Sequence, residues 1–199
     1  MPYRRGPRGA AVLSSLAILS SVFVMSSLAV LSSLVACVHA TVPVRLAQET
    51  KISVALLRDR RDALETAPVP DEVRSQLDAR LAERNLIDDP FGDEAGLSPV
   101  RNTRQRLAAM ASHSNDPILL LVETKVVFFE VLQGRYRWVV YAKLSAAHPK
   151  QLDAAAVREE EIPVFLDYEH EKEDAALVAA SHTLADKAGQ LLDGFLAAP

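Results

Sequence analysis

The feature that most constrains this chain is an uncharged, mostly apolar run over residues 10–36. The only charges before it are Arg4, Arg5 and Arg8. A basic start, an apolar stretch and small residues at its end are typical of an export signal, whose positive charge stays on the cytoplasmic side. Residues 1–36 are therefore predicted to be a signal peptide that takes no part in the folded domain.

The chain's single cysteine, Cys37, follows this run directly. The stretch Leu34-Val35-Ala36-Cys37 resembles a bacterial lipobox, with an aliphatic residue first and Ala before the Cys. The resemblance implies a bacterial lipoprotein in which the Cys37 thiol carries a diacylglycerol, with palmitate as an expected acyl chain. Cleavage would make Cys37 the first residue of the mature protein. Two or three acyl chains would anchor it stably, because one chain alone binds membranes only marginally.

The location follows from the next residue and leaves alternatives open. In lipoproteins of this kind an Asp after the Cys favours the inner membrane, and here the position is Val38, so we expect the outer membrane, facing the periplasm. Cleavage after Ala40 would instead give a secreted protein, since Val38-His39-Ala40 loosely fits the small-residue rule. The apolar run also exceeds the about 20 residues that cross a bilayer, so its retention would make a single-pass inner-membrane protein.

The charge of the remaining chain excludes one class of partner. Taking the three arginines of residues 1–36 from the total of 22 Lys and Arg leaves 19 basic against 26 acidic residues, a net charge of −7. A general nucleic-acid binder needs a basic surface. We therefore expect no nucleic-acid partner, and with a single cysteine we expect no intramolecular disulfide.

Residues 37–50 are predicted to form a lipidated tether, and residues 51–199 a single α/β domain. Periodicity-2 patterns and β-rich composition predict strands, and apolar residues spaced by three and four predict helices. The predicted strands cover residues 51–57, 118–132, 135–145 and 161–166, and the predicted helices cover residues 71–84, 98–112 and 171–197.

Three local signals refine this assignment. Gln133-Gly134 predicts a two-residue hairpin turn, and Pro163 marks an edge strand. The length of the 118–132 strand predicts a bulge near Glu123-Thr124-Lys125. The order of elements predicts an α/β (α+β) fold with a mainly antiparallel sheet of about four strands, helices on one face and a long C-terminal helix.

This order is similar to that of periplasmic domains of the penicillin-binding-protein activator and TolB amino-terminal type. The resemblance is one of layout, and it implies no site residue.

Catalytic and cofactor signals are absent from the sequence. The seven glycines are scattered and form no phosphate loop, and no Gly-x-Ser-x-Gly elbow occurs. We predict no catalytic residue, no cofactor and no metal, and we expect that the protein is not an enzyme. The alternative is an enzyme accessory or weak metal-binding protein that uses His170 within the acidic stretch Glu159–Asp174, which otherwise forms a solvated helix cap.

The remaining candidate for a binding patch is Arg135, Tyr136 and Arg137 beside the hairpin turn, because Arg and Tyr are frequent contact residues. Alternation places Arg135 and Arg137 on one face and Tyr136 with Trp138 on the other, and Trp138 is equally well explained as a core residue. The leading hypothesis is an envelope lipoprotein, attached to the membrane by its lipid, whose non-catalytic domain binds a protein or cell-wall partner or helps assembly.

Overall fold

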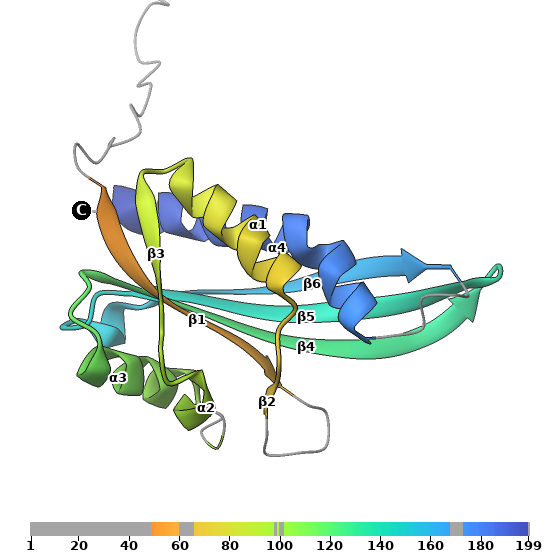
Figure 1. Cartoon of the computed structure of the whole chain (residues 1–199), viewed down its shortest axis with the longest axis horizontal. Helices are drawn as coiled ribbons and strands as arrows, with labels where there is room; N and C mark the ends of the chain where they lie inside the picture. Colours follow the sequence, from red (N-terminus) through yellow and green to blue (C-terminus); the bar gives the residue numbers. More distant parts are fainter. Residues whose placement is uncertain (1–48, 60–65, 98, 100–101, 168–172, 199) are drawn as a thin grey trace, which may run out of the picture. The chain divides into compact units, whose positions relative to one another are not determined.

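The computed structural model describes residues 49–59, 66–97, 99, 102–167 and 173–198, which all belong to one compact unit, Val42–Pro199. The prediction of a lipidated Cys37 lies outside these residues. The elements, labelled in Figure 1, are β1 (Thr50–Asp59), β2 (Thr66–Ala67), α1 (Asp71–Ala82), β3 (Leu86–Pro90), α2 (Glu94–Leu97), α3 (Thr103–His113), β4 (Ile118–Leu132), β5 (Arg135–Ala147), the 3-10 turn η1 (Leu152–Ala154), β6 (Ala156–Leu166) and α4 (Glu173–Ala197).

The strands form one open, mixed sheet in the order β2-β1-β4-β5-β6, with β3 also beside β1. β1 is parallel to β3 and β4, and the other pairs are antiparallel. The predicted α/β class, the long hairpin and the long C-terminal helix are confirmed. Six strands replace the expected four, because β2 and β3 lie in stretches whose Pro and Asp residues indicate loops.

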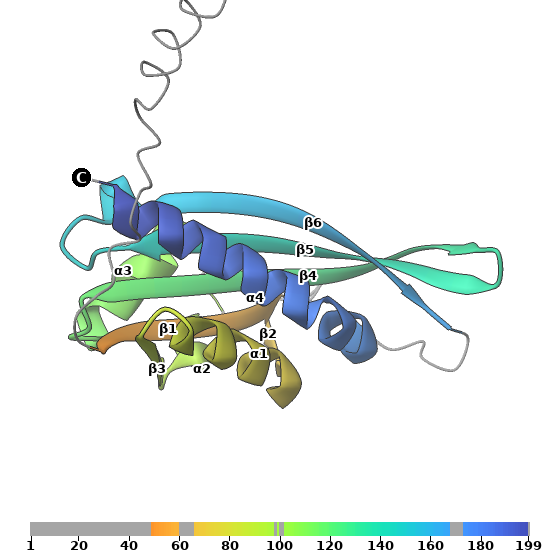
Figure 2. The same cartoon turned by 90° about the horizontal axis from the view of Figure 1, so that it is seen from above.

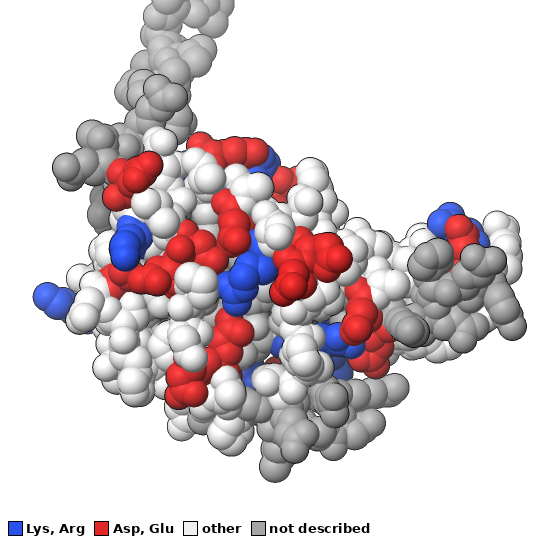
Figure 3. All heavy atoms as spheres, in the orientation of Figure 1, with Lys and Arg blue, Asp and Glu red and all other residues white. Residues whose placement is uncertain are grey.

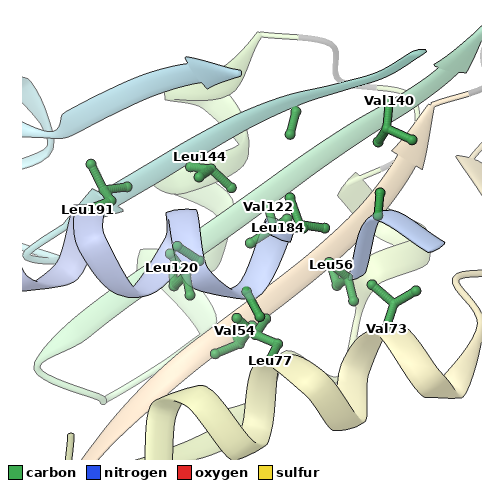
Figure 4. Close-up of a cluster of buried hydrophobic side chains, with 14 of the residues drawn as sticks. Val54, Leu56, Val73, Leu77, Leu120, Val122, Val140, Leu144, Leu184 and Leu191 are labelled. Carbon is green, nitrogen blue, oxygen red and sulfur yellow. The ribbon is translucent and has the colours of Figure 1, made fainter. Parts of the chain in front are cut away.

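The helices cover both faces of the sheet, not one face as the order of elements indicated. On one face, Val54 and Leu56 of β1 pack with side chains of α1 and α4 (Figure 4). On the other face, Ala55 and Leu57 pack with Leu107 of α3 and with α2. β1 is buried along most of its length because a strand between two helix layers needs apolar residues on both sides.

Capping residues set the bounds of two helices. Asn85 follows α1 with a positive φ of 56°, as expected for a residue that ends a helix. The predicted start of the next helix at Ser98-Pro99 is wrong. α3 begins after Asn102, whose side chain accepts hydrogen bonds from the backbone N–H groups of Arg104 and Gln105.

The β4–β5 hairpin turns at Gln133-Gly134 as predicted, with φ values of 53° and 80°. Its bulge lies between Phe128 and Glu130, and the predicted position near Glu123–Lys125 is wrong. β4 pairs with β1 as far as Thr124, and it pairs with β5 without a shift of register as far as Phe128. The extra residue, Phe129, therefore occurs where β4 has left β1.

The hairpin is longer than the layers that cover it. β4 has 15 residues and spans about 50 Å at roughly 3.3 Å per residue, whereas α4 has 25 residues and spans about 38 Å at 1.5 Å per residue. The last residues of β1 lie beside the start of α4, where Arg58 pairs with Glu173 at 2.7 Å. Figures 1 and 2 show the end of the hairpin projecting beyond both.

Candidate functional site

The sequence-predicted patch lies at the projecting end of the hairpin. We call residues 126–139, comprising the end of β4, the turn and the start of β5, the hairpin tip. Tyr136 and Trp138 face the core cluster that includes α4 side chains, and Trp138 is buried there. Arg135 and Arg137 lie on the opposite face, as the alternation predicts, so the three patch residues do not form a single surface.

Arg135 lies half exposed between the hairpin and β6. Its Nη2 donates a hydrogen bond of 3.1 Å to the carbonyl oxygen of Phe165, and its Nε lies 3.2 Å from the Asp167 carboxylate. The guanidinium carbon is 5.9 Å from the centre of the Phe165 ring. Arg135 thereby connects the turn of the hairpin to the end of β6.

Arg137 holds the bulge. Its guanidinium carbon lies 4.7 Å from the centre of the Phe129 ring, and its Nη1 donates a hydrogen bond of 3.0 Å to Glu130. Phe129 and Glu130 therefore both lie on the Arg137 side of the hairpin. A cation over an aromatic face contributes about 0.5–1 kcal/mol at exposed sites. The contact with Arg137 therefore restricts the rotation of the exposed Phe129 ring.

The tip exposes large apolar side chains that the sequence analysis did not assign to a site. They share exposures of 41% to 57% and are Phe128, Phe129, Val131, Leu132 and, from β6, Phe165. Phe128 also packs edge-on against Trp138, with ring centres 5.3 Å apart. We call these five residues the apolar patch. Phe128 and Val131 lie on the face of Tyr136 and Trp138, whereas Phe129, Leu132 and Phe165 lie on the face of the two arginines. Exposed large apolar side chains with arginine beside them are frequent at interaction sites.

One sequence signal could have located the apolar patch. After Ile118–Val122, a second apolar segment, Val126–Phe129, is followed by Glu130, Val131 and Leu132, so apolar residues continue to the free end of the hairpin. No neighbouring element in the predicted order was long enough to cover that end. Exposure of these side chains thus depends on where β1 and α4 stop, a property that local patterns do not contain.

The acidic stretch around β6 is largely paired within the chain. Glu159 lies 3.1 Å from Lys143, and Glu160 pairs with Arg158 and, at 3.5 Å, with Lys187. Figure 3 shows acidic side chains spread over the face that carries α1 and α4. His170, which the metal alternative requires, lies outside the described residues. Among those that are described, no group of three or more potential metal ligands occurs.

Arg106 of α3 is a fully buried cation between two strands. It pairs with Asp59 of β1 at 2.9 Å and with Glu123 of β4 at 2.5 Å, and it donates to the carbonyl oxygen of Leu97 at 3.2 Å. Burial alone would lower the pKa of Arg106, but the hydrogen bonds and charges of both carboxylates outweigh it and raise the pKa. Because acids of the same chain neutralise this cation, we assign it to the core.

The side-chain carboxyl of Asp88, in β3, has a raised pKa. Its side chain is 8% exposed. Burial first, and then the neighbouring carboxyl of Asp78, raise the pKa of Asp88 to about 7, and Arg74 opposes the shift only partly. The site packs α1 against β3 and lies away from the hairpin tip, so we treat it as a feature of stability.

No helix in the described part of the chain is long and apolar enough to cross a membrane.

No protein-family model matches this chain, and no curated protein does. Solved structures with a similar layout include a minor lipoprotein from Acinetobacter baumannii, with 10% identity and a TM-score of 0.41 over 74% of this chain and 95% of that one. Hypothetical protein CT253 from Chlamydia trachomatis has 12% identity and a TM-score of 0.43, covering 74% and 98%. Lipoprotein GNA1162 from Neisseria meningitidis has 10% identity and a TM-score of 0.39, covering 75% and 99%. These similarities assign no residue of this chain.

Proposed function

We propose that this protein is a non-catalytic envelope lipoprotein that binds a partner through the apolar patch of its hairpin tip. The observation that carries the proposal is the exposure of four large apolar side chains on a hairpin that extends past its own helix layer, with a fifth, Phe165, beside them on β6. Burying such side chains against a partner contributes about 25 cal/mol per Å² of apolar surface. Arg137 and Arg135 border the patch and add directional contacts.

The point where the chain enters the domain and the hairpin tip lie at opposite ends of the sheet. β1 begins at Thr50, and two residues later Ile52 lies beside Ile118 at the start of β4. The tip lies at the other end of β4. A lipid on Cys37 and the tether of residues 37–50 would hold the entry end near the outer membrane. The tip would then face away from the anchor, toward the periplasm.

A photocrosslinking experiment in intact cells tests the binding. p-Benzoylphenylalanine replaces Val131, which is 56% exposed in the patch, and in a matched control it replaces Val157, which is 50% exposed on β6. We expect one discrete adduct from position 131, with a yield that falls five- to tenfold when Phe129 is changed to Ala. Equal adducts from both positions, or none from 131, would contradict the proposal.

Incorporation of radiolabelled palmitate tests the proposed lipid anchor on Cys37 separately. Label should enter the wild-type protein and be absent from Cys37→Ala. Label in both proteins, or in neither, would remove the lipid anchor from the proposal and leave the binding patch to stand on the crosslinks.

A further inference from the structure

Past Thr124, the outer side of β4 has no neighbouring strand among the residues that the structure describes. β1 pairs with β4 only as far as the Arg58–Thr124 position, whereas β5 continues alongside β4 to Leu132. We call Lys125–Leu132 the β4 edge. Its outward-pointing backbone N–H and C=O groups are a template for pairing with another strand.

Beyond the end of β1, the two edges of the sheet are β4 and β6, and their residues differ. β6, at the opposite edge, contains Pro163, which has no N–H to donate, and the charged residues Glu159 and Glu161. The β4 edge contains four consecutive apolar residues of high β propensity, Val126–Phe129, and no proline. Lys125, Glu130 and the bulge protect only the ends of this edge, so Val126–Phe128 remains a segment without protection that is able to pair with another strand.

We propose that the β4 edge pairs antiparallel with the β4 edge of a second copy of this chain and forms a two-fold dimer. The inference rests on the proposed role of the hairpin tip as a contact surface, and it names the partner. Charge favours self-pairing in this direction, because Lys125 lies at one end of the apolar segment and Glu130 at the other. Antiparallel copies bring Lys125 toward Glu130, whereas parallel copies would bring like charges together.

The bulge places Lys125 and Glu130 on the same face of the hairpin. Lys125 and Val127 lie on the same face of the hairpin, since residues alternate, and the extra residue Phe129 returns Glu130 to that face, beside Arg137. A two-fold axis at Val127 then places Val127 opposite its counterpart, Val126 opposite Phe128, and Lys125 opposite Glu130. The contact is isologous and uses each edge once, so it closes as a dimer and does not extend into a fibre.

Disulfide crosslinking of the full chain in its native membrane tests the dimer. Two differently tagged copies of Val127→Cys are co-expressed and oxidised, and the product that carries both tags is measured. Val157→Cys, an exposed valine on β6, is the matched control. We expect at least a tenfold higher yield of the doubly tagged dimer from position 127, because Val127 lies on the proposed axis.

A charge exchange in the Val127→Cys background tests the antiparallel direction. Lys125→Glu alone and Glu130→Lys alone each place like charges opposite each other, and each should lower the yield at least threefold. Mixing one copy of each type restores both ion pairs, so the mixed dimer should recover the original yield. Loss in both single variants without recovery on mixing would overturn the proposed register.

The outcomes separate this inference from the proposed function. A position-127 yield no higher than that of position 157 overturns the dimer. If the Val131 photocrosslink nevertheless captures a different protein in a Phe129-dependent way, the proposed function stands and only the identity of the partner is wrong. If neither experiment gives a product, both proposals fail.

Discussion

The guanidinium of Arg137 lies over the ring of Phe129, with 4.7 Å between the guanidinium carbon and the ring centre. Phe129 is the bulge residue of β4, and its ring is 57% exposed. The contact therefore displays an apolar side chain to solvent in a fixed position. An ordered, exposed ring loses less conformational entropy when a partner covers it.

The first prediction concerns this ring. Phe129→Ala should lower the Val131 photocrosslink yield five- to tenfold, because truncating a central aromatic contact usually costs more than 1 kcal/mol of binding. The free energy of unfolding should change by less than about 1 kcal/mol, since the ring is largely exposed in the free protein. Urea unfolding followed by fluorescence of the only tryptophan, Trp138, measures the second quantity. Val157→Ala should change neither, and an equal drop in yield there would refute the assignment.

The second prediction concerns the buried cation of α3. Arg106→Met leaves the Asp59 and Glu123 carboxylates facing each other without a counter-charge, and it should lower the free energy of unfolding by about 3–5 kcal/mol. Arg104 lies on the same helix as Arg106, and Arg104→Met, which removes an exposed ion pair with Asp153 of η1, should cost less than about 1 kcal/mol. Adding Glu123→Gln to Arg106→Met should recover part of the loss. A loss in Arg106→Met no larger than that of Arg104→Met would contradict the role of Arg106 as a buried link between strands.

Local signals predicted the elements whose determinants lie close together in sequence. The hairpin turn at Gln133-Gly134 is an example, because both of its residues adopt positive φ. β3 was missed because Asp88, Asp89 and Pro90 are poor strand residues. It forms because a distant segment, β1, provides the register from Thr50–Leu86 onward.

The candidate site could be predicted only in part, because local sequence signals determine some of its features and distant segments determine the others. The positions of Arg135, Tyr136 and Arg137 beside a turn followed from the sequence, as did their division between two faces. The exposure of Phe128 and Phe129 did not, because an apolar strand residue is normally buried. Only the three-dimensional lengths of β1 and α4 determine that cover ends before these two side chains.

The third prediction compares two glycines at which an added Cβ would meet no atom within 4 Å. Gly134 has a φ of 80° in the hairpin turn, so Gly134→Ala should cost about 1–2 kcal/mol through backbone conformation alone. Gly194 lies in α4, where Gly194→Ala should add about 0.5–1 kcal/mol. Urea unfolding of the two variants should therefore give changes of opposite sign. Changes of the same sign would show that the hairpin turn does not require the left-handed conformation.

The fourth prediction concerns the pH dependence of stability at Asp88. Because its pKa is raised to about 7 in the folded state from an ordinary value of 3.8, the folded protein binds one more proton than the unfolded chain between these two values. The stability that this group contributes is therefore present below about pH 4 and is lost as pH rises toward 7. Asp88→Asn keeps the side chain neutral at every pH.

At pH 8, Asp88→Asn should be more stable than the wild type by on the order of 1–2 kcal/mol, and the difference should shrink toward zero at pH 4. The amide can donate to the Asp78 carboxylate, which supports the gain at high pH. Asp153→Asn, at a side chain that is 81% exposed, should show no such pH-dependent difference. Urea unfolding of the three proteins from pH 4 to pH 8 measures it. A gain for Asp88→Asn that is the same at both ends of this range would mean that Asp88 is ionised throughout, and the buried carboxyl pair between α1 and β3 would then have to be held by Arg74 alone.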